Sequence, residues 1–157
     1  MKIEVEWSKP YRLRDGSDQN LTYACSEFDS FPEGPGVYVF ARRHGNNASP
    51  LYIGQALRLK KRIAHQFNNN RLMNGIQKAQ AGKRILLLGR LMRQQGQQVD
   101  RALDVLESAL IEYALSQGHD LQNKQGTKTP VHVISFRGNR TSRHIAPLHM
   151  PVRRKAK

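Results

Sequence analysis

Two short strand-like runs constrain the fold of this chain more than any other part of its sequence. Residues 36–40 read GVYVF and residues 51–54 read LYIG, so each run combines a tyrosine with a glycine. Alternating β-branched and aromatic residues favour strands, and a Gly-Pro-Gly turn precedes the first run. The composition of HGNNASP, at 44–50, predicts the connecting loop. We therefore expect strands at 37–42 and 51–54 to form an antiparallel hairpin.

The rest of the chain alternates helical and strand patterns. Apolar residues at helical spacing predict helices at 56–67, 72–81 and 99–117, and apolar runs predict strands at 84–92 and 131–136. Residues 3–7 alternate as an edge strand would. With the hairpin first, the order up to residue 117 is β-β-α-α-β-α, which indicates an α+β fold.

Length and composition indicate one domain without a membrane partner. A chain of 157 residues fits a core at 35–137, an N-terminal extension at 1–34 and a flexible basic tail at 138–157 that lacks an apolar period. No segment approaches about 18 consecutive apolar residues, and the start lacks the apolar region of a secretion signal. The single Cys25 and six scattered histidines argue against disulfides and structural zinc. We expect a cytoplasmic protein.

Charge is distributed unevenly along the chain. There are 26 Lys and Arg against 12 Asp and Glu, which gives a net charge of +14. Between Gly34 and Val99 there is no acidic residue, although twelve Lys and Arg lie there. A soluble surface usually mixes both signs, so a long acid-free basic segment indicates a polyanionic partner. Nucleic acid, and DNA in particular, is the expected partner; charge alone would also suit an anionic membrane, which the absence of a long apolar segment argues against.

One carboxylate interrupts the apolar stripe of the longest predicted helix. Glu107 lies among Leu103, Leu106, Leu110, Ile111 and Ala114, which recur at spacings of three and four. A carboxylate at such a position costs free energy unless it is paired or binds a metal. The alternative is a glutamate at the boundary that reaches solvent or pairs with an arginine. Asp100 and Asp104 have a simpler explanation, since acids suit the first turn of a helix.

Together these residues resemble the GIY-YIG nuclease superfamily. The matching elements are Gly36-Val37-Tyr38, Tyr52-Ile53-Gly54, Arg62 ten residues after Tyr52, Glu107 on the long helix and Asn123 beyond it. The resemblance covers about residues 35–123. It implies a small three-stranded antiparallel sheet flanked by helices. It also implies a metal-dependent endonuclease that hydrolyses DNA phosphodiester bonds.

The resemblance implies a role for each matching residue. Glu107 would bind a single Mg²⁺ or Mn²⁺, which suits a hard oxygen donor, and Arg62 would contact the scissile phosphate. Tyr52, together with Tyr38, would orient or deprotonate the attacking water. His65 would assist from the turn after Arg62, and Asn123 would fix the tyrosine geometry or contact a phosphate.

Further residues would support substrate binding and the backbone. The expected nucleic-acid contacts are Arg58, Lys60, Lys61, Arg71 and Arg84, and the glycines Gly36 and Gly54 would allow tight backbone turns. Two features depart from the family pattern. Gln55 stands where some members have lysine, and Asn123 follows Glu107 by sixteen residues without a preceding proline.

Two other functions remain open from the sequence. One is a non-catalytic nucleic-acid-binding protein that keeps the same scaffold, and the other is an RNA-associated basic protein. Because the chain has little room for a targeting domain, a partner protein or a homo-oligomer is also expected. The enzyme hypothesis requires Tyr38, Tyr52, Arg62 and Glu107 to converge on one face. A salt bridge that holds Glu107 away from the tyrosines would favour the binding protein.

Overall fold

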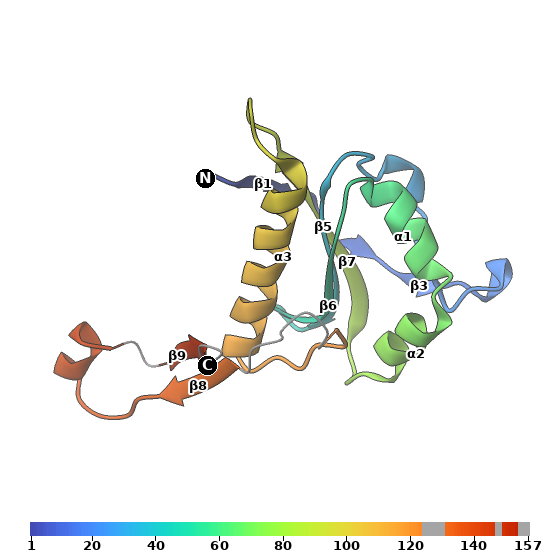
Figure 1. Cartoon of the computed structure of the whole chain (residues 1–157). Helices are drawn as coiled ribbons and strands as arrows, with labels where there is room; N and C mark the ends of the chain where they lie inside the picture. The colour runs from blue at the N-terminus through green and yellow to red at the C-terminus, as the bar shows by residue number, and fades with distance from the viewer. Residues whose placement is uncertain (124–130, 147–148, 154–157) are drawn as a thin grey trace.

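A five-stranded antiparallel sheet forms the centre of the computed structural model, which describes residues 1–123, 131–146 and 149–153 (Figure 1). Its strands follow the order β1-β7-β5-β6, and β2 also pairs with β7. They are β1 (Glu4–Trp7), β2 (Tyr11–Arg12), β5 (Gly36–His44), β6 (Asn47–Ala56) and β7 (Lys83–Met92). The sheet therefore has two more strands than the three expected from the sequence. N-terminal residues extend it by pairing with the outer edge of β7.

Helices cover both faces of this sheet. Figure 1 shows α3 on one side and the shorter helices α1 and α2 on the other. Their bounds are α1 (Leu59–Phe67), α2 (Asn70–Lys78) and α3 (Val99–Ser116). The first predicted helix begins too early, because Ala56 still pairs with Gly36 in the sheet. Among the described residues, no helix combines the length and apolar character needed to cross a lipid bilayer.

Strand alternation divides the core between the two layers. On β5, Tyr38 and Phe40 pack into the cluster that includes Leu59, Ile63 and Met73 of α1 and α2. The intervening residues Val39 and Ala41 pack on the other face, in a cluster with Ile111 and Ala114 of α3. The sheet thus directs the motif tyrosine of β5 toward α1 and α2.

The hairpin of β5 and β6 is longer and tighter than the sequence indicates. Pairing continues to His44 and Asn47, which leaves a turn of Gly45 and Asn46 in place of the expected loop at 44–50. Gly45 adopts φ +60°, as the primed turns of short hairpins require. A register shift between Phe40 and Ala41 bulges β6 at Leu51, just before Tyr52.

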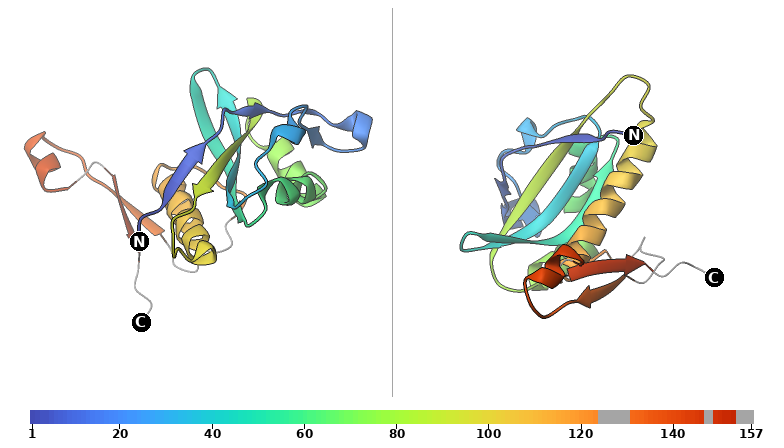
Figure 2. Two further views of the ribbon diagram at one scale, coloured as in Figure 1. Left: turned by 90° about the horizontal axis from the view of Figure 1, so that it is seen from above. Right: turned by 90° about the vertical axis from the view of Figure 1, so that its left-hand side faces the viewer.

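Smaller elements flank the sheet. A two-stranded sheet of β3 (Arg14–Asp15) and β4 (Tyr23–Ala24) lies near the N-terminus with the short helices η1 (Ser17–Gln19) and η2 (Phe28–Ser30). The strands β8 (Val131–Ser135) and β9 (His149–Arg153) pair beside α3 and flank η3 (Thr141–His144). Figure 2 shows this hairpin projecting from the sheet. The expected loose tail at 138–157 therefore includes a paired strand, and its last four residues lie outside the described part.

Candidate active site

The two motif tyrosines lie on one face of the β5–β6 hairpin. Tyr52 is paired with Phe40, two residues from Tyr38, so all three side chains point the same way. The rings of Tyr38 and Tyr52 stack with their centroids 6.0 Å apart and an interplanar angle of 25°. Tyr38 is buried, whereas Tyr52 is half-buried and reaches the surface.

Gly54 provides the space for Tyr38. It is paired with Tyr38 across the hairpin, and a Cβ at Gly54 would meet the Cζ and hydroxyl oxygen of the phenol. A Cβ at Gly36 would meet the carbonyl oxygen of Gly89 on β7. Both glycines lie within strands, and neither is among the described glycines with positive φ. The structure thus gives them a packing role instead of the expected role in turns.

The environment of Tyr38 keeps this phenol protonated. Burial raises the pKa of Tyr38 to about 12, and the nearby Tyr52 raises it as well. A hydrogen bond from Gln66 Nε2 to the Tyr38 hydroxyl, 2.6 Å long, and the charge of Arg62 both lower the pKa of Tyr38 in part. Burial is the largest of these effects, so Tyr38 is a poor base at neutral pH.

Glu107 faces the hairpin from α3. Its carboxylate is half-buried, and burial is the main reason that its pKa is raised. Gln55 Nε2 donates to Glu107 Oε2 at 3.3 Å and to Asp104 Oδ1 at 2.6 Å. Asp104 raises the pKa of Glu107, while Gln55 and the charge of Arg62 lower it. The ion pairs found among the described residues do not include Glu107.

One surface pocket joins the glutamate to the exposed tyrosine. Its volume is about 550 Å³, and it is lined by Tyr52, Asn69, Arg71, Leu72, Glu107, Gln122 and Asn123. Arg62 is exposed on α1, and its charge acts on both Tyr38 and Glu107. Of the four residues expected to converge, Tyr52 and Glu107 line this pocket, whereas Tyr38 and Arg62 are not among its lining residues.

The segment after α3 closes the free edge of β6. The Asn123 side chain accepts a hydrogen bond from the Ile53 N–H at 3.2 Å and donates another to the Ile53 carbonyl. The Gln122 N–H donates to the Leu51 carbonyl at 2.7 Å. Asn123 thus holds the backbone next to Tyr52, which favours its expected role in fixing the tyrosine geometry.

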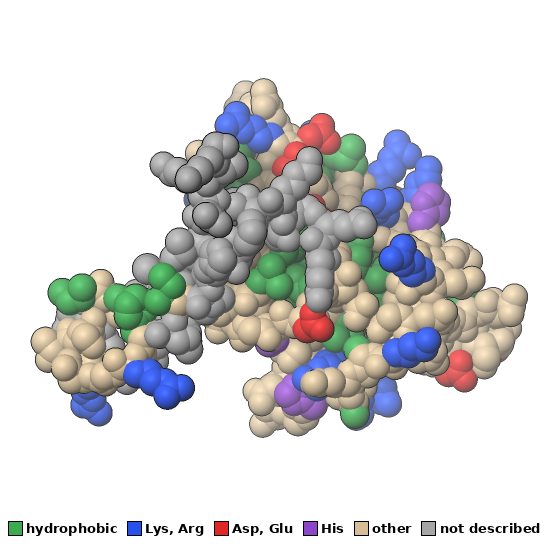
Figure 3. Space-filling model, turned by 60° about the horizontal axis from the view of Figure 1, so that its bottom comes forward, with side chains coloured by type: hydrophobic (Ala, Val, Ile, Leu, Met, Phe, Trp, Pro, Cys, Tyr) green, Lys and Arg blue, Asp and Glu red, His purple; other side chains and the backbone are tan. Residues whose placement is uncertain are grey.

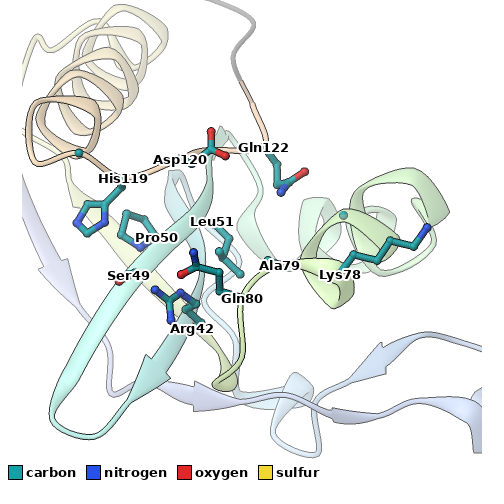
Figure 4. Close-up of a pocket in the computed structure, with 12 residues that line it drawn as sticks. Arg42, Ser49, Pro50, Leu51, Lys78, Ala79, Gln80, His119, Asp120 and Gln122 are labelled. Carbon is teal, nitrogen blue, oxygen red and sulfur yellow. The ribbon is translucent and has the colours of Figure 1, made fainter.

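A second pocket adjoins this edge. It has a volume of about 510 Å³ and shares Gln122 with the first pocket. In Figure 4, Arg42 and Gln80 lie close together, while the side chain of Lys78 points away from the cavity. The two pockets together follow the edge of β6 from Glu107 toward the end of α2.

Two glutamines for which the sequence predicts no role contact the site residues, Gln66 at Tyr38 and Gln55 at Glu107. His65 is exposed on α1, whereas its neighbour Gln66 is buried and contacts Tyr38. Gln66 falls on the apolar stripe of α1, three residues after Ile63. A polar residue on such a stripe needs a hydrogen-bond partner, and that signal could have identified it. Gln55 gives no comparable signal, because its contacts with α3 depend on the tertiary fold.

The basic residues have different surroundings. Arg58 and Lys61 are exposed near the start of α1, and Arg71 is exposed at the rim of the first pocket. Lys60 Nζ lies 3.2 Å from the Asp29 carbonyl and 5.5 Å from the ring centroid of Phe28. Figure 3 shows Lys and Arg side chains spread across one face of the molecule.

Arg84 does not join this exposed set. Its side chain is buried, and its five N–H groups are directed to carbonyl oxygens at the end of α2 and in the following turn. Four of these contacts measure 2.9 Å and the fifth, to Gln77, measures 3.5 Å. Arg84 thus caps α2, and its guanidinium has no free donor for the phosphate contact expected from the sequence.

Comparison of the chain with models of protein families, with curated proteins and with solved structures finds no match.

Proposed function

We propose that this chain is a GIY-YIG-type endonuclease that hydrolyses DNA phosphodiester bonds with the help of one Mg²⁺ or Mn²⁺. The order β5-β6-α1-α2-β7-α3 supports a β-β-α-α-β-α core of that kind. The observation that carries the proposal is the shared pocket of Tyr52 and Glu107. Arg62, whose charge acts on Tyr38 and Glu107, adds the cation that phosphate chemistry requires.

The residues around Glu107 fit a hard divalent cation. Its carboxylate faces the pocket with a raised pKa, and it has no ion-pair partner among the described residues. Mg²⁺ is often held by one or two carboxylates together with water and substrate phosphate. When bound, the cation would stabilise negative charge on the phosphate. Gln55 would hold the Glu107 carboxylate in place through its amide group.

Other side chains in or near the pocket would act on the substrate. Arg62 would neutralise charge that develops on the scissile phosphate. Tyr52 reaches the surface and would orient the attacking water or accept its proton, whereas the buried Tyr38 would support Tyr52 from below. Asn123 would hold the strand that carries Tyr52.

Plasmid cleavage in the presence of Mg²⁺ tests this function. We expect Glu107→Gln, Arg62→Ala and Tyr52→Phe each to slow cleavage by about 100-fold or more, as loss of a charge-stabilising group does elsewhere. The matched controls are Asp100→Asn on α3 and Arg93→Ala after β7, both exposed. Cleavage that survives both Glu107→Gln and Arg62→Ala would exclude this site as its source.

One observation favours a second function, a non-catalytic nucleic-acid-binding protein on the same scaffold. Gln55 already gives Glu107 a hydrogen-bond donor, so the carboxylate has a partner without a cation. This alternative predicts DNA or RNA binding that survives Glu107→Gln, without cleavage by the wild-type protein. A competition gel shift between duplex DNA and folded RNA identifies the ligand.

The proposal extends to how the protein finds its target and to where in the cell it acts. The chain would act with a partner protein or with a second copy of itself to choose its target. The buried Cys25 is a free thiol, as expected of a protein in the reducing cytoplasm.

A further inference from the structure

Two basic side chains lie opposite each other at one end of the sheet. Arg43 of β5 is the cross-strand partner of Lys83 at the start of β7. Side chains that are directly opposite in an antiparallel pair have Cβ atoms about 4.5–5.5 Å apart, and like charges there are destabilising. Both side chains are exposed, and neither belongs to an ion pair among the residues that the structure describes. The sheet therefore holds two positive charges side by side without a counter-charge.

The backbone next to Lys83 fixes this arrangement. Gly82 adopts φ +144°, which residues with a side chain rarely adopt, and a Cβ there would lie 2.8 Å from the Arg43 carbonyl oxygen. This close approach lets β7 begin at Lys83, directly beside Arg43. The repulsion is thus built into the turn and the strand pairing. A local arrangement that costs stability without an evident gain in the free protein is expected at functional positions.

Further cations surround the Arg43–Lys83 pair. Arg42 projects to the opposite face of β5 and lines the pocket of about 510 Å³ together with His119 (Figure 4). Its Nη1 donates to the Ala81 carbonyl at 3.1 Å. The pocket lining includes the acidic Asp120, whereas the whole segment from 34 to 99 contributes no acidic residue. Positive charge from β5 and β7 therefore extends around this end of the sheet.

Along β6, this end lies close to the proposed active site. Arg43 is paired with Ala48, which is four residues before Tyr52. At about 3.3 Å per residue, four residues of a strand span about 13 Å. The phosphates of one DNA strand are spaced about 3.4 Å apart along the duplex axis, so this length corresponds to about four base pairs. A duplex that meets Tyr52 and Glu107 with its scissile phosphate is therefore long enough to reach Arg43 and Lys83.

We propose that Arg42, Arg43 and Lys83 form a second DNA-binding surface, which holds the phosphate backbone of a duplex about four base pairs from the bond that is cut. A phosphate between Arg43 and Lys83 would neutralise both charges and replace their repulsion by two charge-assisted contacts. The choice of DNA as the ligand rests on the proposed nuclease function, whereas the repulsion is a property of the free protein. This surface is separate from the contacts expected on α1 and at Arg71.

Reversing the charge of Lys83 separates stability from binding. In Lys83→Glu the new carboxylate faces Arg43 across the strands, so a repulsion becomes an attraction. We expect the melting temperature to rise by about 2–4 °C, although DNA binding weakens. The matched control is Arg93→Glu, which changes the net charge equally at an exposed residue just after β7. An unchanged or lower melting temperature of Lys83→Glu would overturn the repulsion from which the surface is inferred.

Fluorescence anisotropy of a short labelled duplex, recorded with EDTA, measures binding without cleavage. We expect Lys83→Glu to weaken binding by about tenfold or more and to reduce the salt dependence by about two phosphate contacts, because Lys83 is lost and Arg43 becomes paired. Arg93→Glu should keep the wild-type salt dependence. The same loss in both variants would show that Arg43 and Lys83 are ordinary solvated charges, and would overturn the proposal. Stronger binding of the wild-type protein to a folded RNA hairpin than to the duplex would overturn DNA as the ligand.

A double variant tests whether the two side chains act as a pair. Arg43→Glu combined with Lys83→Glu places two carboxylates opposite each other, so we expect the gain in melting temperature to disappear while binding stays weak. A further rise in melting temperature would show that the two side chains do not interact, and would contradict the shared phosphate contact. If the wild-type protein bound the duplex but did not cleave it with Mg²⁺, the proposed function would fail. The comparison of Lys83→Glu with Arg93→Glu would still decide the binding surface.

Discussion

At the scale of single residues, the site depends on the space left by a missing side chain. Because Gly54 lies opposite Tyr38, we expect Gly54→Ala to push the phenol out of its stack on Tyr52. Overpacking of this kind costs about 1–3 kcal/mol, which urea unfolding measures. The control is Gly34→Ala, since a Cβ at Gly34 meets no atom within 4 Å. Equal stability of the two variants would show that the phenol has room to move.

The buried phenol also predicts a dependence of stability on pH. The pKa of Tyr38 rises from 10.0 to about 12 on folding, so its contribution is complete below pH 10 and is lost as the pH rises through about 12. Across this window the loss is about 2–3 kcal/mol. The free energy of unfolding of Tyr38→Phe should therefore fall less steeply between pH 10 and pH 12. Parallel curves for wild type and variant, measured by denaturant titration, would contradict the burial of the hydroxyl.

The sequence identifies the residues that face the pocket better than those that support them. Tyr38, Tyr52 and Glu107 follow from motif spacing and from a carboxylate on an apolar stripe. The contacts of the Gln55 and Gln66 amides with Asp104, Glu107 and Tyr38 do not, because those partners lie 28 or more residues away along the chain. Such contacts exist only once the sheet has brought the helices together.

At the scale of elements, Arg84 attaches the end of α2 to β7. Arg84→Met would keep much of the apolar stem but leave the carbonyls at the end of α2 without their donor. We expect a loss of about 2–4 kcal/mol, since hydrogen bonds to charged groups are worth more than neutral ones. In hydrogen-exchange measurements, the backbone amides of α2 should show the largest increase in exchange rate. The neighbouring exposed Lys83→Met is the control, and equal exchange in both variants would argue against the cap.

Elements were easier to predict than their pairing. The order of strands and helices between residues 36 and 116 follows from apolar periodicity, and boundaries differ by a few residues. The segment at 44–50 has the composition of a loop, yet cross-strand pairing with β5 makes most of it a strand. The alternation at residues 3–7 predicts the edge strand that β1 forms, but its pairing with β7 and the addition of β2 depend on the tertiary fold.

At the scale of the whole molecule, the net charge of +14 predicts strong salt dependence of DNA binding. When the logarithm of the DNA-binding constant is plotted against the logarithm of the salt concentration, each lost phosphate contact reduces the slope by about one. We expect this change for Lys61→Gln, whose side chain is exposed on α1. Lys2→Gln should leave the slope unchanged, because Lys2 is paired with Glu4 in the N-terminal extension. Equal slopes for the two variants would show that the DNA does not bind at the exposed side of α1 that carries Lys61.

The closure of β6 by Asn123 has a consequence for solubility. Unpaired N–H and C=O groups along an outer strand are templates on which another chain can add a strand, and natural proteins protect them. Here a single amide side chain occupies both groups of Ile53. Without it, the strand that carries Tyr52 would be open to intermolecular pairing, so the same asparagine guards the protein against aggregation.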